Sequence, residues 1–397
     1  MKNVVILGST GTIGINSLKV IDSLRDKFNV YSITCNTNVT RLKSQINKFT
    51  PKYAVITNEK IYLNFVNKNG KKIDNTKILY GFDSIDDIVS HKNVDIIVAA
   101  ITGFACLKPV ITSIKNDKRI LAANKEILVS AGEIIISLLK KSKSLFFPLD
   151  SEHNALLQII LASGLEYKIN NMKYYENKIQ SITLTASGGP FIDIPTKQLK
   201  YVTSKDAIKH PTWKMGKKIS VDSSTMMNKG LELIEAKLLF NINLKNINAV
   251  IHRESIVHAF VEFMDGTIIS HMSDPDMKIP ISYAFCYPER LRNKRRIIDR
   301  LHNIRLEKLN EDKFKCYKLA RIAAEIGKNS GLILNAANEI SVEYFLKDKI
   351  KFLDIPKIIE IIMERSKLIK HSSIDNLISN DLQVRQDTVN LIEEKFL

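Results

Sequence analysis

A glycine-rich loop, Gly8–Gly14 (GSTGTIG), follows the apolar run Val4–Gly8 and leads into a helical stretch. At the first strand-to-helix turn of a β-α-β unit, such a loop lets backbone amides approach a dinucleotide pyrophosphate. Its spacing is G-x-x-G-x-x-G rather than G-x-G-x-x-G, and Ser9, Thr10 and Thr12 add hydroxyl groups. The alternative is a tight turn without a ligand.

Residues 1–150 repeat this order of a short β-rich run followed by a helical stretch. The runs lie at 4–8, 29–35, 53–57, 94–100 and 119–123, with helical stretches at about 13–27 and 41–49. The alternation predicts an α/β fold whose N-terminal domain, 1–150, is a Rossmann-like, doubly wound parallel sheet.

The pattern changes twice beyond residue 150. Alternating strands at 179–187, 247–263 and 266–272 predict an α+β catalytic domain over 151–288, ending in an irregular segment marked by Pro275, Pro280 and Pro288. A basic linker is expected at 289–311. Stretches within 312–397 repeat apolar residues at i, i+3 and i+4, which predicts a C-terminal helical bundle.

Composition narrows the classes of protein. No apolar run approaches the roughly 18 residues of a membrane span, and Met1 leads directly into a strand, so we expect no membrane segment and no leader peptide. Four dispersed cysteines without a C-x-x-C pair argue against disulfides and fit a cytoplasmic location. The net charge of +17 has its densest patch at 290–300, without aromatic residues. It favours a lysine-rich surface that attracts phosphorylated ligands over nucleic-acid binding.

The end of the second predicted strand indicates which nicotinamide cofactor would bind. An NAD site places Asp or Glu there for the ribose 2′-hydroxyl. This chain has Asn36, Thr37 and Asn38 instead, followed by Arg41. The missing carboxylate and the nearby arginine favour the 2′-phosphate of NADP, although Arg41 facing solvent is the alternative.

Two carboxylates flank a serine in the run Asp150–Gln158 (DSEHNALLQ), directly after an apolar stretch. If the strand continues to this point, Asp150 and Glu152 leave the same face of it. Two converging hard oxygen ligands suit Mg²⁺ or Mn²⁺. The alternative is a solvated acidic turn that caps the next helix.

Three further segments carry candidate chemistry. In LAANKE, Asn124 could meet the nicotinamide and Lys125 a developing alkoxide, at a strand end where ligands of open α/β sheets collect. In TASGGPF, exposed amides and the Ser187 hydroxyl suit an anion. The segment at about 206–217, with the single tryptophan Trp213, suits a lid that excludes water. A surface lysine, a plain Gly-Gly-Pro turn and a tryptophan staple are the respective alternatives.

The run Asp222–Phe240 (DSSTMMNKGLELIEAKLLF) predicts a helix whose N-terminus is capped by Ser223 and Ser224. Serines at a helix start, an amide at Asn228 and the adjacent Lys229 together suit a phosphate group. Glu232, one turn further on, offers a third carboxylate for the cation of Asp150 and Glu152, and Glu235 is a candidate supporting residue. An ordinary amphipathic helix does not explain the surrounding apolar residues.

Taken together, GSTGTIG, LAANKE, DSEHNAL, TASGGPF, HPTWKMG, SSTMMNKGLELIEA and SDPDMKIPISYA, in this order and spacing, resemble the 1-deoxy-D-xylulose-5-phosphate reductoisomerase family. The resemblance extends from about residue 4 into the C-terminal helices. It implies an NADPH-dependent homodimer that converts 1-deoxy-D-xylulose 5-phosphate to 2-C-methyl-D-erythritol 4-phosphate on the methylerythritol phosphate route to isoprenoids, with a divalent cation such as Mg²⁺, Mn²⁺ or Co²⁺.

The resemblance also implies roles for individual residues. The cation ligands would be Asp150, Glu152 and Glu232, and the catalytic residues Lys125, Glu152 and His210. The sugar phosphate would contact Lys125, Ser151, Glu152, Ser187, His210, Trp213, Ser223, Asn228, Lys229 and Glu232. The cofactor would contact Thr10, Gly11, Thr12, Ile13, Asn36, Thr37, Asn38, Asn124, Glu126 and Gly216.

This chain departs from the family at Thr37, where a lysine is common, so NADPH selectivity is expected to weaken or to depend on Arg41. The chief rival is an NADP-dependent semialdehyde or homoserine-type dehydrogenase, which needs no three-carboxylate cation site. A DNA-binding redox sensor is a second rival, but the sequence shows no helix-turn-helix segment with basic and aromatic residues.

Overall fold

The structure is a computed structural model that describes the whole chain except residues 170, 210–211, 214–215, 293–303 and 371–372. The chain divides into two compact units. Unit 1 comprises 1–127, 137–154 and 276–294, and unit 2 comprises 128–136, 155–275 and 295–397. The segments of the two units alternate along the sequence.

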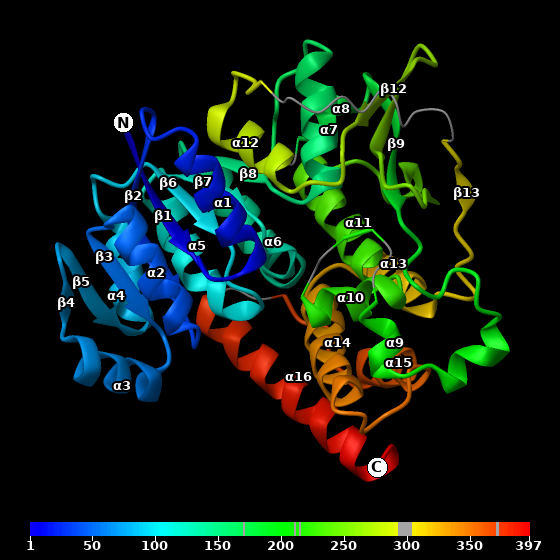
Figure 1. The fold of residues 1–397 in the computed structure, drawn as a ribbon. Helices are drawn as coiled ribbons and strands as arrows, with labels where there is room; N and C mark the ends of the chain where they lie inside the picture. The colour runs from blue at the N-terminus through cyan, green and yellow to red at the C-terminus, as the bar shows by residue number, and fades with distance from the viewer. Residues whose placement is uncertain (170, 210–211, 214–215, 293–303, 371–372) are drawn as a thin grey trace. The chain divides into compact units, whose positions relative to one another are not determined.

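Unit 1 is built on an eight-stranded sheet in the order β4-β5-β3-β2-β1-β6-β7-β8 (Figure 1). All described pairings are parallel except that of β4 with β5. The strands are β1 (Lys2–Leu7), β2 (Phe28–Cys35), β3 (Tyr53–Ile56), β4 (Lys72–Ile73), β5 (Thr76–Tyr80), β6 (Ile96–Ala99), β7 (Arg119–Ala122) and β8 (Leu145–Pro148). Val4 to Leu7 are fully buried, as expected for a parallel strand covered on both faces. The predicted doubly wound sheet is confirmed.

Helices connect these strands. They are α1 (Thr12–Asp22), α2 (Val39–Phe49), α3 (Glu59–Asn69), α4 (Gly81–Ser90), the 3₁₀ turn η1 (Phe104–Cys106), α5 (Leu107–Lys115), α6 (Lys125–Lys141) and α12 (Lys278–Cys286). The middle turns of α6 belong to unit 2. The sequence prediction treated the residues around Pro280 as irregular, but they form α12, because a proline is tolerated in the first turn of a helix. Helix α12 packs against α1, and the ring of Phe285 on α12 lies 5.2 Å from the ring of Phe28 on β2.

Unit 2 contains a five-stranded mixed sheet in the order β12-β11-β9-β10-β13. Its strands are β9 (Ile179–Ala186), β10 (Ile247–Ile251), β11 (Val257–Phe263), β12 (Ile268–Met272) and β13 (Glu307–Lys308). The single strand predicted over 247–263 is wrong: a turn at 252–256 divides it into β10 and β11, which lie on opposite sides of β9. Ser255 at positive φ marks this reversal.

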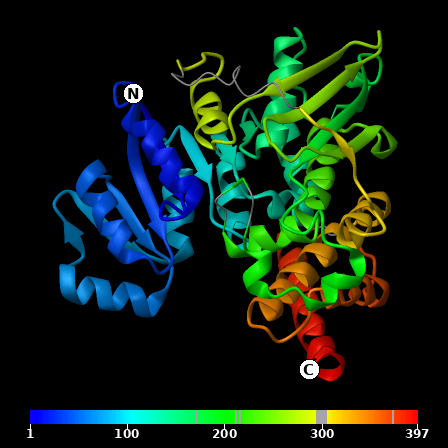
Figure 2. The same cartoon turned by 45° about the vertical axis from the view of Figure 1, so that its right-hand side comes forward.

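The helices of unit 2 include the predicted C-terminal bundle (Figure 2). They are α7 (Ser151–Ala162, which begins in unit 1), α8 (Met172–Tyr175), η2 (Thr196–Tyr201), α9 (Ser204–Ala207), α10 (Lys217–Ser224), α11 (Met227–Phe240), η3 (Leu244–Asn246), α13 (Lys315–Ile326), α14 (Ser330–Leu346), α15 (Asp354–Arg365) and α16 (Ile374–Lys395). Within the bundle, α14 contacts α13, α15 and α16, and it also contacts α10. The C-terminal helices are confirmed, and α14 connects them to the segment that carries Ser223.

All four cysteines are free and buried. Among the helices that the structure describes, none combines the length and the apolar character needed to cross a membrane.

Candidate active site

Two positions in the loop of unit 1 require glycine, because other backbone atoms lie close to them. Gly8 has φ +83°, and a Cβ atom there would lie 2.7 Å from the Ala100 carbonyl oxygen. A Cβ atom on Gly14 would lie 2.4 Å from the Gly8 carbonyl oxygen. Gly11 and Thr12 are exposed at the start of α1, where no side chain caps the helix. The first amides of α1 are therefore available to an anion.

The Ser9 hydroxyl does not face a ligand, although the sequence suggested that it would add to the exposed amides of the loop. Ser9 is fully buried, and its Oγ donates a hydrogen bond to Gln45 Oε1 at 2.7 Å. Gln45 Nε2 donates in return to the Ser9 carbonyl oxygen at 2.8 Å. Ser9 therefore fixes the loop on α2, and only the predicted hydroxyls of Thr10 and Thr12 remain for a ligand.

The segment after β2 is exposed and lacks an acidic side chain. Asn36, Thr37 and Asn38 are all exposed, and Asn38 Oδ1 accepts a hydrogen bond from the Arg41 amide at 3.1 Å, so Asn38 caps α2. The Arg41 guanidinium does not extend freely into solvent. Its Nη1 donates to the Thr10 carbonyl oxygen at 3.0 Å, which places a cation beside the glycine loop.

The loop after β7 places a lysine next to a carboxylate. Asn124 is buried, and its side chain caps α6 and donates to the carbonyl oxygens of Ile101 and Gly103 at 2.7 Å each. These bonds hold Asn124 rigidly at the carboxyl edge of the sheet. The adjacent Lys125 forms an ion pair with Asp150, and both side chains are largely buried.

Asp150 and Glu152 converge, but not for the reason that the sequence suggested. The strand β8 ends at Pro148, and α7 begins at Ser151, so these residues lie at a helix start and the predicted strand spacing is wrong. One carboxylate oxygen of Asp150 lies within 4.8 Å of one from Glu152. Ser151 Oγ donates to Glu152 Oε2 at 2.6 Å. The positive end of α7 favours carboxylates here.

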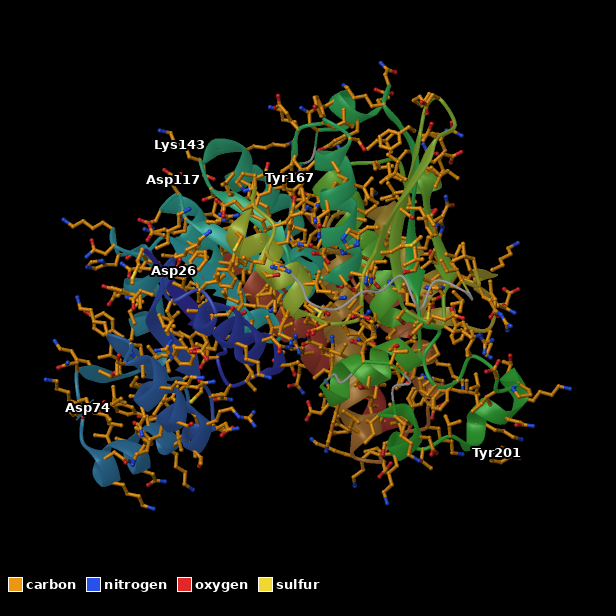
Figure 3. The ribbon with its side chains drawn as sticks, turned by 45° about the horizontal axis from the view of Figure 1, so that its top comes forward. Asp26, Asp74, Asp117, Lys143, Tyr167 and Tyr201 are labelled. Atoms are coloured by element: carbon orange, nitrogen blue, oxygen red, sulfur yellow. The ribbon has the colours of Figure 1, made fainter. Side chains whose placement is uncertain are left out.

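Asp150 and Glu152 are less exposed than several other carboxylates in the loops of unit 1. Other loop carboxylates of unit 1, such as Asp26, Asp74 and Asp117, are exposed at turns on the outside of the unit (Figure 3). A solvated acidic turn is therefore a poor description of Asp150 and Glu152, since both are partly buried and Asp150 is paired with a lysine.

Unit 2 brings the loop that carries Ser187 next to the end of α10, which carries Ser223. Ser187 follows β9, and Gly188 and Gly189 after it have φ values of +81° and +66°. A Cβ atom on Gly189 would lie 2.7 Å from the Ser223 carbonyl oxygen. The predicted helix cap is wrong, because Ser223 and Ser224 end α10 and the left-handed residue Met226 separates them from α11.

The polar cluster predicted on α11 is present. Asn228 and Lys229 lie in its first turn, and Glu232 is fully buried. Asn228 Nδ2 donates a hydrogen bond to Glu232 Oε1, and Lys229 Nζ donates to Glu232 Oε2. A buried carboxylate is thus compensated by one cation and one amide at the start of a helix.

The predicted lid is described in part. His210 lies outside the described residues, and Gly216 is exposed where α10 begins. The Trp213 ring lies 6.4 Å from the ring of His258 on β11, and Thr212 Oγ1 lies 3.2 Å from Ser255 Oγ. Sequence reasoning missed His258 and Ser255, because neither the strand nor the turn that carries them has a motif that points to residues over 40 positions away.

A glycine loop at the carboxyl edge of a parallel sheet with the order 3-2-1 on one side is typical of dinucleotide-binding proteins, and this is the class to which the fold and the loop point. The 1-deoxy-D-xylulose 5-phosphate reductoisomerase family model matches residues 4–132, the model of its C-terminal domain matches 146–240, and the model described as DXP reductoisomerase C-terminal domain matches 272–387. The chain belongs to the 1-deoxy-D-xylulose 5-phosphate reductoisomerase family.

Full-length relatives agree with this assignment. The 1-deoxy-D-xylulose 5-phosphate reductoisomerase of Ruthia magnifica is 40% identical, over 99% of this chain and 100% of the relative. The Clostridium tetani enzyme is 43% identical, over 96% and 97%. A crystal structure of DOX-P reductoisomerase in complex with NADPH, fosmidomycin and magnesium is 35% identical over 100% of both chains, with a TM-score of 0.91. The Zymomonas mobilis enzyme in complex with NADPH is 33% identical over 99% of both chains, with a TM-score of 0.88.

Proposed function

We propose that this chain catalyses the NADPH- and divalent-cation-dependent conversion of 1-deoxy-D-xylulose 5-phosphate to 2-C-methyl-D-erythritol 4-phosphate, in the methylerythritol phosphate pathway of isoprenoid precursor synthesis. The observation that carries the proposal is the pair Asp150 and Glu152, converging at the start of α7 within the fold of this family. An NADP-dependent semialdehyde or homoserine-type dehydrogenase would not need this pair.

The glycine loop supports NADPH binding. Gly8 and Gly14 leave no room for a side chain, which is the property a loop needs if its amides are to contact a pyrophosphate. The proposed contacts are Thr10, Gly11, Thr12, Ile13, Asn36, Thr37, Asn38, Asn124, Glu126 and Gly216. When bound, NADPH supplies the hydride. The exposed Asn36–Asn38 segment and Arg41 would face the 2′-phosphate, where a carboxylate would repel it.

The donor set of the cation site is chemically suited to Mg²⁺, Mn²⁺ or Co²⁺. Asp150, Glu152 and Glu232 are the proposed ligands, and all of them are oxygen donors. When bound, the cation supplies Lewis-acid stabilisation of negative charge on substrate oxygens. Ser151 holds Glu152 through its hydroxyl. Lys125 pairs with Asp150, and Asn228 and Lys229 donate hydrogen bonds to Glu232.

The remaining residues bind and orient the sugar phosphate. Ser187, Ser223, Asn228 and Lys229 are proposed to hold the phosphate, because they offer hydroxyl, amide and ammonium donors within one unit. Lys125, Ser151 and His210 are proposed to contact the reacting carbons and oxygens. Trp213, on the lid at 206–217, would exclude water while one carbon–carbon bond breaks, another forms and the branched aldehyde is reduced.

The decisive experiment follows NADPH oxidation with 1-deoxy-D-xylulose 5-phosphate, with and without a chelator. We expect turnover that requires added Mg²⁺ or Mn²⁺ and that disappears in the Glu152→Gln variant. Turnover of a semialdehyde that survives both the chelator and Glu152→Gln would instead identify the dehydrogenase.

We also propose a cytoplasmic homodimer, with a dinucleotide domain at 1–150, a catalytic domain at 151–288, a linker at 289–311 and a helical domain at 312–397. The edge strand β12 supports the dimer, since Ile268 is 61% and Ile269 is 37% exposed there and Met264 nearby is 55% exposed. No described strand pairs with the outer side of β12, and an apolar edge of this kind readily joins a second copy. Sedimentation equilibrium of the purified chain and of Ile268→Lys tests this, and a monomeric wild type would contradict it.

A further inference from the structure

A buried carboxylate precedes one of the proposed phosphate-binding residues. Asp222 is 1% exposed and lies directly before Ser223 at the end of α10. Its Oδ1 accepts a hydrogen bond from Asn338 Nδ2 at 2.9 Å. Its Oδ2 forms an ion pair with Lys218 Nζ at 2.8 Å. Asn338 is fully buried on α14, 116 residues further along the chain.

The burial of the Asp222 carboxylate and the Asn338 amide has a free-energy cost. Burying a carboxylate and an amide lowers stability unless both are hydrogen-bonded. A negative charge next to an anion site also opposes phosphate binding unless it is compensated and held in place. Lys218 supplies the compensating charge, and Asn338 fixes the direction of the carboxylate.

Other bonds make the end of α10 a rigid support for Ser223. Thr225 Oγ1 donates to the Asp222 carbonyl oxygen at 3.2 Å, and Ser224 Oγ donates to the Ala207 carbonyl oxygen at 2.8 Å. Gly189, two residues after Ser187, packs against the Ser223 carbonyl group. A shift of Asp222 would therefore move both proposed serine donors.

We propose that Asn338 is a positioning residue for the phosphate subsite: from the C-terminal bundle it holds Asp222, and through Asp222 it sets the position of Ser223. The inference rests on the proposed function, since it needs Ser223 to bind the substrate phosphate. It assigns to α14 a part in substrate affinity, in addition to its part in the core of the bundle.

The test is Asn338→Leu, which keeps the branched shape and the number of heavy atoms of the side chain and removes the donor. Loss of a hydrogen bond to a charged group predicts a rise of about tenfold in KM for 1-deoxy-D-xylulose 5-phosphate. The inhibition constant of inorganic phosphate should rise in parallel, while kcat and NADPH affinity change by less than about threefold. A purely structural role would lower stability and leave the KM of the folded enzyme unchanged.

Asn335→Leu is the matched control. Asn335 lies on the same helix and is equally buried, but its Nδ2 donates to Glu339 Oε1 at 3.3 Å. It should lose stability without a change in KM. The exchange Asp222→Asn with Asn338→Asp re-forms the bond with the partners reversed, and we expect it to recover phosphate affinity relative to Asn338→Leu.

The outcomes separate the two proposals. If Ser223→Ala raises KM but Asn338→Leu does not, or if Asn335→Leu raises KM equally, the positioning role is overturned and the proposed function stands. If the wild-type protein does not convert the sugar phosphate at all, the proposed function itself fails.

Discussion

Arg41 Nη1 donates a hydrogen bond to the Thr10 carbonyl oxygen at 3.0 Å, joining the first turn of α2 to the glycine loop that precedes α1. The guanidinium is thereby held at the proposed cofactor site, beside the exposed Asn36–Asn38 segment. Thr37 in that segment offers a neutral hydroxyl group and no positive charge. Arg41 is consequently the described cation best placed to compensate a 2′-phosphate in this chain.

We predict that Arg41→Gln weakens NADPH binding by about tenfold and leaves NADH binding nearly unchanged, because it removes a charge-assisted contact of about 1.5–3 kcal/mol. Thr37→Lys should tighten NADPH relative to NADH and should partly restore the Arg41→Gln variant. Titration of cofactor fluorescence measures the affinity of each protein for NADPH and for NADH without turnover. Lys43→Gln on the same helix is the control, since Lys43 Nζ pairs with Asn69. An unchanged ratio of the two cofactor affinities in both variants would contradict this assignment.

Gly14→Ala should impair both folding and cofactor binding. The added Cβ atom would lie 2.4 Å from the Gly8 carbonyl oxygen and 2.5 Å from Ser9 Cα, so the loop and α1 must separate. We expect the free energy of unfolding to fall by about 1–3 kcal/mol and NADPH affinity to fall by at least about tenfold. Gly11→Ala is the stability control, because its nearest non-neighbouring atom would lie 3.5 Å away. Equal stability of the two variants in urea unfolding would contradict the prediction.

Lys229→Met should remove an ammonium group that stabilises a buried carboxylate, because Lys229 Nζ bonds one oxygen of Glu232. Removing one partner of a buried ion pair costs about 3–5 kcal/mol. The double variant Lys229→Met with Glu232→Gln should regain most of that stability. It should still lack turnover, since it has lost a proposed phosphate-binding lysine and a proposed cation ligand. Lys237→Met, at the other end of α11, removes a lysine bonded to a carbonyl group instead and should keep the KM for the sugar phosphate. Thermal unfolding and steady-state kinetics of the three proteins check this.

The parallel sheet and the C-terminal helices were predictable because hydrophobic period and glycine position are local signals. The geometry of Asp150 and Glu152 was not. An apolar run before DSE suggests that the strand continues, but the Asn154 amide donates to the Asp150 carbonyl oxygen at 2.9 Å, and its Nδ2 donates to the Pro148 carbonyl oxygen at 2.9 Å. These bonds turn the chain into α7, so the two carboxylates converge at a helix start and not on one face of a strand.

Ser223 shows the same limit. Two serines before an apolar run are typical of a helix cap, yet Met226 adopts φ +61° and separates two helices there. A left-handed methionine is uncommon, and no sequence rule favours it. The contacts of Asp222 with Asn338 and of Trp213 with His258 join residues 116 and 45 positions apart, so only tertiary packing brings them together.

The thiol of Cys106 gives a prediction about pH. Cys106 is fully buried, and this burial raises the pKa of its thiol to about 12, whereas an unfolded cysteine has a pKa of about 8.5. Between these values the unfolded state binds fewer protons than the native state, so this group lowers the free energy of unfolding as pH rises, by about 1.4 kcal/mol per pH unit.

The stability advantage of the wild type over Cys106→Ala should therefore shrink by roughly 2 kcal/mol between pH 8 and pH 10. Urea unfolding at several pH values measures it. Val110→Ala, a buried apolar change on α5, the helix that directly follows Cys106, should show a stability difference that does not vary with pH. A constant difference for Cys106→Ala as well would mean that the thiol is accessible to water in the native protein.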